Sequence, residues 1–310
     1  MPKLDVVGVG LSTMDILIRL AEMPTWDKRS TMDQVNFDGG GPTATALCAA
    51  ASLGAKAGFI GTAGEDWFAE QKRQSLREHG VDISRVVPRS GPEKRVVCVY
   101  VNANTGDRIF NRMDHFYEDL VQPKELDQFY ITQADYLLTE GFHSEAAVTA
   151  ARWMRAAGKR VVLDAAATTS TQIDERLTDL VPLTDILICG SGFAKALTGE
   201  EDPAVAGKAA LSFGPDIVVI THGEMGSLLF SNDESLHTPA FDIDVLDTTG
   251  AGDVFHGAFI VGLLKNWDLQ KVCIFASAAA AIACTFLGGR AGLSKYSQVE
   301  QFLHGRGYTL

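Results

Sequence analysis

A run of small residues ends in an aspartate in the last quarter of the chain, where Asp247 to Asp253 reads DTTGAGD before the apolar stretch VFHGAFI. Gly250, Ala251 and Gly252 have almost no side chain, so their N–H groups are unobstructed. They precede a predicted helix, whose unpaired first N–H groups and positive dipole end favour an anion such as a phosphate. Asp253 would repel that phosphate, but it is suited to be the general base for a hydroxyl that attacks it. A capping aspartate on a structural helix is the alternative.

A second glycine-rich stretch, DGGGPTATA, covers Asp38 to Ala46 and leads into a helix of small residues. Glycines at such a position bring the backbone close to a neighbouring group. One interpretation is that Gly40 and Gly41 let a polyol lie against the main chain while Thr45 donates a hydroxyl. The other interpretation is a tight turn with close helix packing.

A third stretch, GVGLST, supplies Gly8 and Gly10 but has Thr13 where a third glycine would complete a dinucleotide-binding fingerprint. The hypothesis of a dinucleotide-dependent oxidoreductase rests on these two glycines alone. A tight, buried strand end explains them as well.

Short β-like runs alternate with helix-like runs along most of the chain. This order predicts an α/β fold with a parallel sheet and helices on both faces. The predicted strands are 4–10, 57–64, 136–141, 160–164, 185–190 and 216–223, and the predicted helices are 43–53, 66–79, 144–157, 193–197, 205–213, 250–264 and 269–286.

Two segments, 12–37 and 94–112, alternate apolar and polar residues and lack a helical pattern. The second is typical of a hairpin that turns at Asn104-Thr105-Gly106. We expect them to pair into a small β-sheet lid beside a main domain built from 1–11, 38–93 and 113–310. An edge extension of the main sheet is the alternative.

Composition limits the classes of partner. Lys plus Arg number 27 and Asp plus Glu 39, which gives a net charge of −12 and argues against broad binding to nucleic acid or to an anionic membrane. The five cysteines are scattered without a CxxC pair, which favours reduced thiols in a cytoplasmic protein. Residues 272–289 are uncharged but rich in Ala, Ser and Cys, which favours a buried helix over a membrane span.

The motifs resemble those of a known family. DTTGAGDVFHGAF is similar to the C-terminal signature of the ribokinase-like (PfkB) carbohydrate kinases, and GGGPTATALCAAASLGA resembles the family's N-terminal di-glycine motif. The order of the elements agrees over essentially the whole chain. The resemblance implies a ribokinase-like sandwich with a β lid, a homodimer formed through the lid, and phosphorylation of a sugar hydroxyl by ATP and Mg²⁺.

The resemblance also assigns roles to single residues. Asp253 falls on the family's catalytic base, and Gly250, Ala251 and Gly252 fall on its anion hole. The positions that match sugar-binding residues are Asp15, Gly40, Gly41 and Glu140. Thr45 stands where ribokinases usually have asparagine, which puts ribose itself in doubt. The positions that match the nucleotide-binding turn are Thr221, Gly223 and Gly226, and those where some members bind a monovalent cation such as K⁺ are Asp247 and Thr249.

One departure concerns the metal. The family usually carries an Asn-x-x-Glu motif linked to magnesium, and here Gly190 and Phe193 occupy those two positions. We expect Mg²⁺ to be held through water and other carboxylates such as Asp164. The same loss motivates a second hypothesis, a sugar or nucleotide sensor without strong catalysis, and a nucleoside kinase is a further alternative.

Within the family, GGGPTATA and the late GGRAGL (288–293) are most similar to a sugar-kinase branch that includes sulfofructose kinases. An arginine expected at the end of YLLTEG is replaced by Gly141. The polar residues of the lid segments that could meet an anionic substrate group are Lys28, Arg29, Asn111 and Arg112. A solvated charged face explains them equally well.

Overall fold

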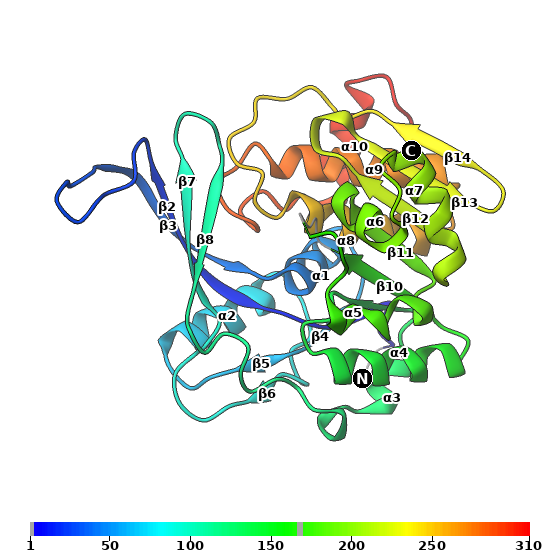
Figure 1. Ribbon diagram of the computed structural model, residues 1–310, viewed down its shortest axis with the longest axis horizontal. Coiled ribbons are helices and arrows are strands. Elements are labelled where there is room, and N and C mark those ends of the chain that lie inside the picture. The colour runs from blue at the N-terminus through cyan, green and yellow to red at the C-terminus, as the bar shows by residue number, and fades with distance from the viewer. Residues whose placement is uncertain (1–2, 166–169) are drawn as a thin grey trace.

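The main sheet of the protein has eight strands in the order β14-β13-β12-β11-β10-β9-β1-β4 (Figure 1). The computed structural model describes residues 3–165 and 170–310. The strands from β4 to β12 run parallel, whereas β13 is antiparallel to both of its neighbours, β12 and β14. Their bounds are β1 (Val6–Val9), β4 (Ala57–Ile60), β9 (Tyr136–Thr139), β10 (Arg160–Ala165), β11 (Ile186–Gly190), β12 (Ile217–Thr221), β13 (Ser227–Ser231) and β14 (Ser235–Thr238).

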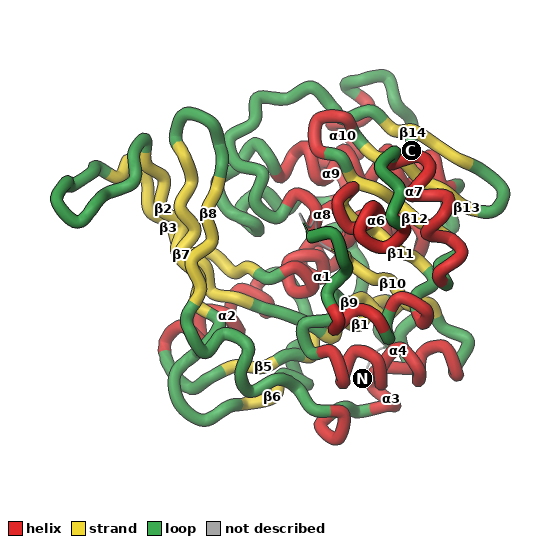
Figure 2. Tube along the Cα trace, viewed as in Figure 1, coloured by secondary structure: helices red, strands yellow, loops and turns green. Residues whose placement is uncertain are grey.

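Helices cover both faces of this sheet, which confirms the predicted α/β fold (Figure 2). On one face lie α1 (Pro42–Ser52), α8 (Ala251–Leu264), α9 (Leu269–Ala283) and α10 (Tyr296–His304), and on the other α3 (Gln128–Thr132), α4 (Ser144–Ala156), α5 (Glu175–Thr178), α6 (Ser191–Thr198) and α7 (Pro203–Ala210). Strand residues alternate between the two cores. On β10, for example, Val162 packs in the first core, whereas Val161 and Leu163 pack in the second.

Helix ends follow from local capping. Asp66 accepts from the Ala69 N–H and starts α2 (Trp67–Glu78), and Asp268 accepts from the Lys271 N–H at 2.8 Å and starts α9. The uncharged run after 272 is the buried part of α9, which ends at Ala283, three residues earlier than predicted. Among the described residues, none of the helices has both the length and the hydropathy to span a bilayer.

A second sheet projects from the body of the protein (Figure 1). It contains β3 (Met32–Gly40), β2 (Thr13–Leu20), β7 (Val96–Asn102) and β8 (Arg108–Arg112), in that order. The central pair β2–β7 is parallel, and the two outer pairs are antiparallel. Strand β3 runs on through Gly40, so the glycine motif ends a strand of this sheet and leads directly into α1. A two-stranded sheet of β5 (Thr62–Ala63) and β6 (Val87–Pro88) lies nearby.

The two faces of the second sheet differ because side chains alternate along each strand. Strand pairing places Asp15, Val97 and Arg112 side by side on the inner face. The opposite, outer face carries Ile16, Ile18, Val35, Phe37, Tyr100 and Ile109. The inner face is therefore the one that can meet the carboxyl ends of the main sheet.

Candidate active site

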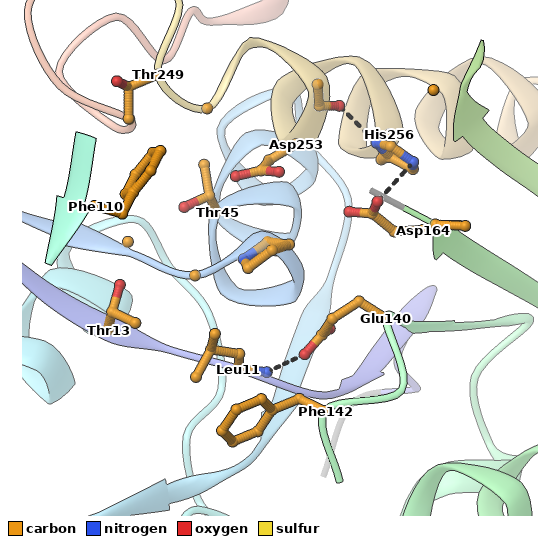
Figure 3. A pocket seen from close by; sticks show the side chains of 18 of the residues that line it. Leu11, Thr13, Thr45, Phe110, Glu140, Phe142, Asp164, Thr249, Asp253 and His256 are labelled. Carbon is orange, nitrogen blue, oxygen red and sulfur yellow. Dashed lines mark hydrogen bonds and ion pairs between the residues drawn. The ribbon is translucent and has the colours of Figure 1, made fainter. Parts of the chain in front are cut away.

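A cleft of about 1040 Å³ separates the inner face of the second sheet from the carboxyl ends of β9 to β12 and the start of α8 (Figure 3). Open α/β sheets bind their ligands at this edge. The predicted site residues that line the cleft are Asp15, Gly40, Gly41, Thr45, Arg112, Glu140, Thr221, Gly223, Thr249, Gly250, Gly252 and Asp253.

The start of α8 offers unpaired N–H groups to the cleft. Gly250 caps the helix at φ 75°, and a Cβ on it would lie 2.8 Å from the Gly289 Cα, so only glycine fits. The Ala251 N–H donates to the Thr248 carbonyl at 3.3 Å. No acceptor among the described residues takes the N–H of Gly252 or Asp253. The Gly250 N–H has no acceptor among them either, so Ala251 alone of the three predicted positions has its N–H engaged.

Asp253 stands half-buried on the first turn of α8, beside these groups (Figure 3). Burial, and next the charge of Asp164, raise the pKa of Asp253 to about 7, although His256, Arg290 and Arg108 act in the opposite direction. A carboxylate with a pKa near neutrality can accept a proton from a hydroxyl and is an effective general base at that pH.

His256, for which the sequence offered no explanation, links Asp253's helix to β10 and β11. Its Nδ1 lies 2.6 Å from the Gly252 carbonyl, and its Nε2 lies 3.2 Å from the Ile188 carbonyl and 3.4 Å from Asp164 Oδ1. The imidazole ring therefore ties the first turn of α8 to the Ile188 carbonyl on β11 and lies beside the carboxyl group of Asp164.

Asp164 is the side chain that best fits a metal. Its Oδ2 is buried without a hydrogen-bond partner, and the residue lines the cleft. Burial raises its pKa, and His256 lowers it. Phe193 packs in the core and Gly190 caps α6, so neither supplies a ligand. Over residues 3–165 and 170–310, no three His, Cys, Asp or Glu side chains gather as a metal site. Mg²⁺ commonly needs only one or two carboxylates beside phosphates and water.

The three glycines of DGGGP each make room for a different neighbour. A Cβ on Gly39 would lie 2.2 Å from Arg290 Nη1, and one on Gly40 would lie 2.1 Å from Asp15 Oδ2. Gly41 has φ 90° and turns against the Leu11 carbonyl. Asp15 accepts from Thr13 Oγ1 at 2.6 Å, and burial raises its pKa to about 6.

Glu140 closes the floor of the cleft at the end of β9. Its Oε1 accepts from the Leu11 N–H at 2.5 Å (Figure 3). Its Oε2 contacts Thr43 Oγ1. Burial is the main cause that raises its pKa to about 8, and Asp164 and Asp253 contribute. Both oxygens therefore already hold the loop after β1 and the start of α1.

Several predicted residues lie outside the cleft lining. Asn111 is on the outer face of the second sheet, because it alternates with Phe110 and Arg112, which line the cleft. Lys28 and Arg29 lie in the exposed loop between β2 and β3, where Lys28 pairs with Glu22 at 2.6 Å.

Two loop residues have structural contacts instead. A Cβ on Gly226 would lie 2.0 Å from the Thr238 carbonyl, so this glycine allows the turn before β13 to pack closely. Asp247 Oδ1 accepts from the N–H and hydroxyl of Thr249, and its Oδ2 accepts from the Gly288 N–H at 2.9 Å. Asp247 therefore orders the loop that leads to Gly250.

Sequence reasoning missed four polar residues in or behind the cleft: Arg108, Tyr117, Arg176 and Arg290. Arg108 on β8 contacts Thr248 Oγ1 and so joins the second sheet to the loop before α8. The alternation of Arg108, Phe110 and Arg112 on one strand was a signal that could have found it. Arg112 contacts the Tyr117 hydroxyl.

The cleft therefore combines a helix start with open N–H groups, a carboxylate beside them and a polar pocket beneath a small sheet. These features suit the transfer of an anionic group to a hydroxyl.

Comparison with known proteins agrees with this chemistry. Residues 3–295 match the pfkB family of carbohydrate kinases. The ribokinase of Haemophilus influenzae is 31% identical over 274 residues, which covers 85% of this chain and 87% of that protein. The ribokinase of Thermotoga maritima has a similar fold, with a TM-score of 0.83, 24% identity, and coverage of 97% of this chain and 99% of that one. The structure of the ribokinase of Arabidopsis thaliana complexed with ribose and ATP is also similar, with a TM-score of 0.81 and 22% identity. The match covers 96% of this chain and 98% of that one.

The chain belongs to the pfkB family of carbohydrate kinases, as its motifs predicted. Its reaction class is the ATP-dependent phosphorylation of a sugar. The oxidoreductase hypothesis is wrong, and the structure gives the two glycines another reason. A Cβ on Gly8 would lie 2.5 Å from Thr43 Cγ2, and one on Gly10 would lie 2.1 Å from Glu140 Oε2.

We predict that Gly40→Ala weakens acceptor binding, because its new Cβ would displace Asp15 and Thr13. The KM for the sugar should rise about tenfold or more, while the KM for ATP stays within about twofold. Steady-state kinetics of both substrates measure this. Gly305→Ala is the matched control, because its Cβ would have ordinary contacts, the nearest at 3.4 Å. An unchanged sugar KM in Gly40→Ala would show that Asp15 does not position the sugar.

Proposed function

We propose that Asp253 deprotonates a sugar hydroxyl as that hydroxyl attacks the γ-phosphate of ATP. The observation that carries this proposal is the position of a half-buried carboxylate, with a pKa near neutrality, beside the open N–H groups of α8. Those N–H groups offset negative charge that develops on the transferred phosphoryl group. Gly250, Gly252 and Asp253 supply them, and Gly250 also shapes the turn.

The acceptor sugar lies between the two sheets in this proposal. Asp15 and the Gly40–Gly41 backbone contact its hydroxyls, and Glu140 and Thr45 border the same space. Segments 12–37 and 94–112 act as a lid, and the rest of the chain forms the main domain. Closure of a lid excludes water and so suppresses hydrolysis of ATP. The closer resemblance to the sulfofructose kinase branch stays a prediction.

ATP occupies the other end of the cleft, beside Thr221, Gly223 and the start of α8. Asp164 is the residue that would hold Mg²⁺, directly or through water, together with the ATP phosphates. The ion supplies positive charge to the transferred phosphoryl group when it is bound. A K⁺ ion near Asp247 and Thr249, and a cytoplasmic location, remain proposals from the family resemblance.

Release of ADP across a panel of acceptors tests the proposal, with Mg·ATP and K⁺ present. The panel contains ribose, fructose, ketohexose acids, sulfofructose, fructose phosphates, inositols and nucleosides. Turnover of one sugar identifies the substrate, and turnover of nucleosides alone would favour a nucleoside kinase. Tight sugar binding without turnover by any panel member would favour the sensor.

Asp253→Asn should lower kcat by about 100- to 10,000-fold, because the amide cannot accept the hydroxyl proton. Binding of ATP, followed by calorimetry, should change little. Asp244→Asn removes an exposed carboxylate from the preceding loop and serves as the control. Wild-type turnover in Asp253→Asn would exclude the base mechanism.

The pH dependence should report the ionisation of Asp253. Its folded pKa is raised to about 7 and that of Asp15 to about 6, and the carboxylates must be ionised to act. The kcat/KM for the sugar should therefore fall as the pH drops below about 7. The titratable and charged groups that face Asp253 are Asp164, His256, Arg290, Arg108 and Glu140. A flat kcat/KM profile between pH 5.5 and 8 would contradict this assignment.

We also propose a homodimer formed through the outer face of the lid. Val35, Phe37 and Ile109 on that face are 49%, 51% and 58% exposed, and a second copy could cover them across a two-fold axis.

The dimer proposal predicts that Ile109→Glu dissociates the protein, because it places a charge in an apolar interface. Light scattering after size exclusion measures the mass. Val205→Glu, at a site on α7 that is 48% exposed, should leave the dimer intact. A monomeric wild-type protein would end this proposal.

A further inference from the structure

Arg290 lies buried behind the acceptor pocket and contacts three separate segments of the chain. It is 2% exposed. Its Nη2 donates to the Gly40 carbonyl at 2.7 Å, its Nη1 to Ser75 Oγ at 2.9 Å, and its Nε to Thr45 Oγ1 at 3.3 Å. Its own N–H donates to Asp38 Oδ2 at 2.9 Å. The guanidinium thus joins the end of β3, α1 and α2 from the loop after α9.

The charge of Arg290 has no carboxylate within ion-pair distance among the described residues. Its side-chain acceptors are a carbonyl and two hydroxyls, all neutral. Burying a cation in this way is costly, so a role for the charge is expected. Arg290 acts on two carboxyl groups of the cleft, those of Asp15 and Asp253. Burial raises the pKa of each, and the charge of Arg290 lowers it.

The contact with Arg290 also fixes the direction of the Thr45 hydroxyl. Arginine can only donate, so Thr45 Oγ1 must be the acceptor of that bond. No acceptor among the described residues takes the Thr45 hydroxyl proton. Thr45 lines the cleft, and Figure 3 shows its side chain beside the space that Asp253 faces. The proton is therefore available to a ligand in the acceptor pocket.

We propose that Arg290 is a positioning residue of the acceptor pocket, which makes Thr45 a hydrogen-bond donor to the sugar and fixes the Gly40 backbone against it. This inference rests on the proposed function of the cleft. The resemblance assigns Thr45 to the sugar side, but it gives Arg290 no role. Arg290 touches no substrate in this proposal and acts through the two groups that do.

The pair also indicates the chemistry of the sugar atom that meets Thr45. A donor backed by a buried cation favours an oxygen that accepts, such as a carbonyl, carboxylate, sulfonate or hydroxyl oxygen. It disfavours a cationic amine at that position. Asparagine offers both a donor and an acceptor, so the Thr45–Arg290 pair is more restrictive than the residue that ribokinases carry there.

Kinetics of Thr45 and Arg290 variants test the proposal, with the panel sugar that the wild type phosphorylates best as the probe. Thr45→Val should raise the sugar KM about tenfold while kcat and the ATP KM stay within about twofold. Thr45→Ser keeps the hydroxyl and should stay within about threefold of wild type. Arg290→Lys keeps the charge but cannot reach all three acceptors, so its sugar KM should also rise about tenfold.

The double variant separates positioning from a general loss of structure. Because Arg290 acts partly through Thr45 and partly through Gly40, the rise in sugar KM for Thr45→Val with Arg290→Lys should be at least about threefold smaller than the product of the two single effects. Fully multiplied effects on the sugar KM would overturn the proposal. Thr149→Val and Arg155→Lys, on α4, are the matched controls.

Two further outcomes are distinct. If Arg290→Lys does not fold, as judged by circular dichroism and thermal unfolding, the Thr45→Val and Thr45→Ser pair decides alone. Equal sugar KM values for those two variants would refute the donor role. Failure of the wild type to phosphorylate any sugar would instead refute the proposed function, because no variant is needed to see it.

Discussion

Four carboxyl groups share one buried cleft, and this crowding of negative charge is the constraint on which the site depends. Burial raises the pKa of Asp15, Glu140, Asp164 and Asp253, and the charges at Asp164 and Asp253 reinforce the shift at Glu140. ATP would add further anions to the same space. The site can hold it only because cations and helix N–H groups stand close by, and bound Mg²⁺ would complete that balance. The raised pKa values describe the cleft before it receives this positive charge.

The site also depends on glycines, which let the backbone approach its functional groups closely. Gly250 lets the start of α8 lie against Gly289, and Gly39 and Gly40 let the end of β3 pass over Arg290 and Asp15. The loop 288–290 lies behind both, so the phosphate-binding and sugar-binding parts of the cleft share one support. A displacement of that loop would therefore move both parts of the cleft, because close-packed interiors transmit small displacements.

The order of strands and helices could be predicted from the sequence because it depends on local periodicity and on capping residues such as Asp66 and Asp268. The glycine motifs located two parts of the cleft lining for a related reason, since each motif is local. Asn111 was misplaced because a shift of one residue along β8 moves a side chain to the other face of the sheet. Arg290 has partners 215 to 252 residues away in the chain, and no local pattern reveals contacts of that range.

The departure at Gly190 and Phe193 is consistent with the placement of His256. Phe193 occupies the core where the family pattern would supply a carboxylate, so the cleft carries one negative charge fewer. On the same side, His256 Nε2 lies 3.4 Å from Asp164 Oδ1, so one oxygen of that carboxyl group already faces the imidazole ring. Few protein oxygens are then left for the metal, which favours a Mg²⁺ ion held mainly by the ATP phosphates and water. The metal would then arrive with the nucleotide and leave with it, rather than reside in the protein.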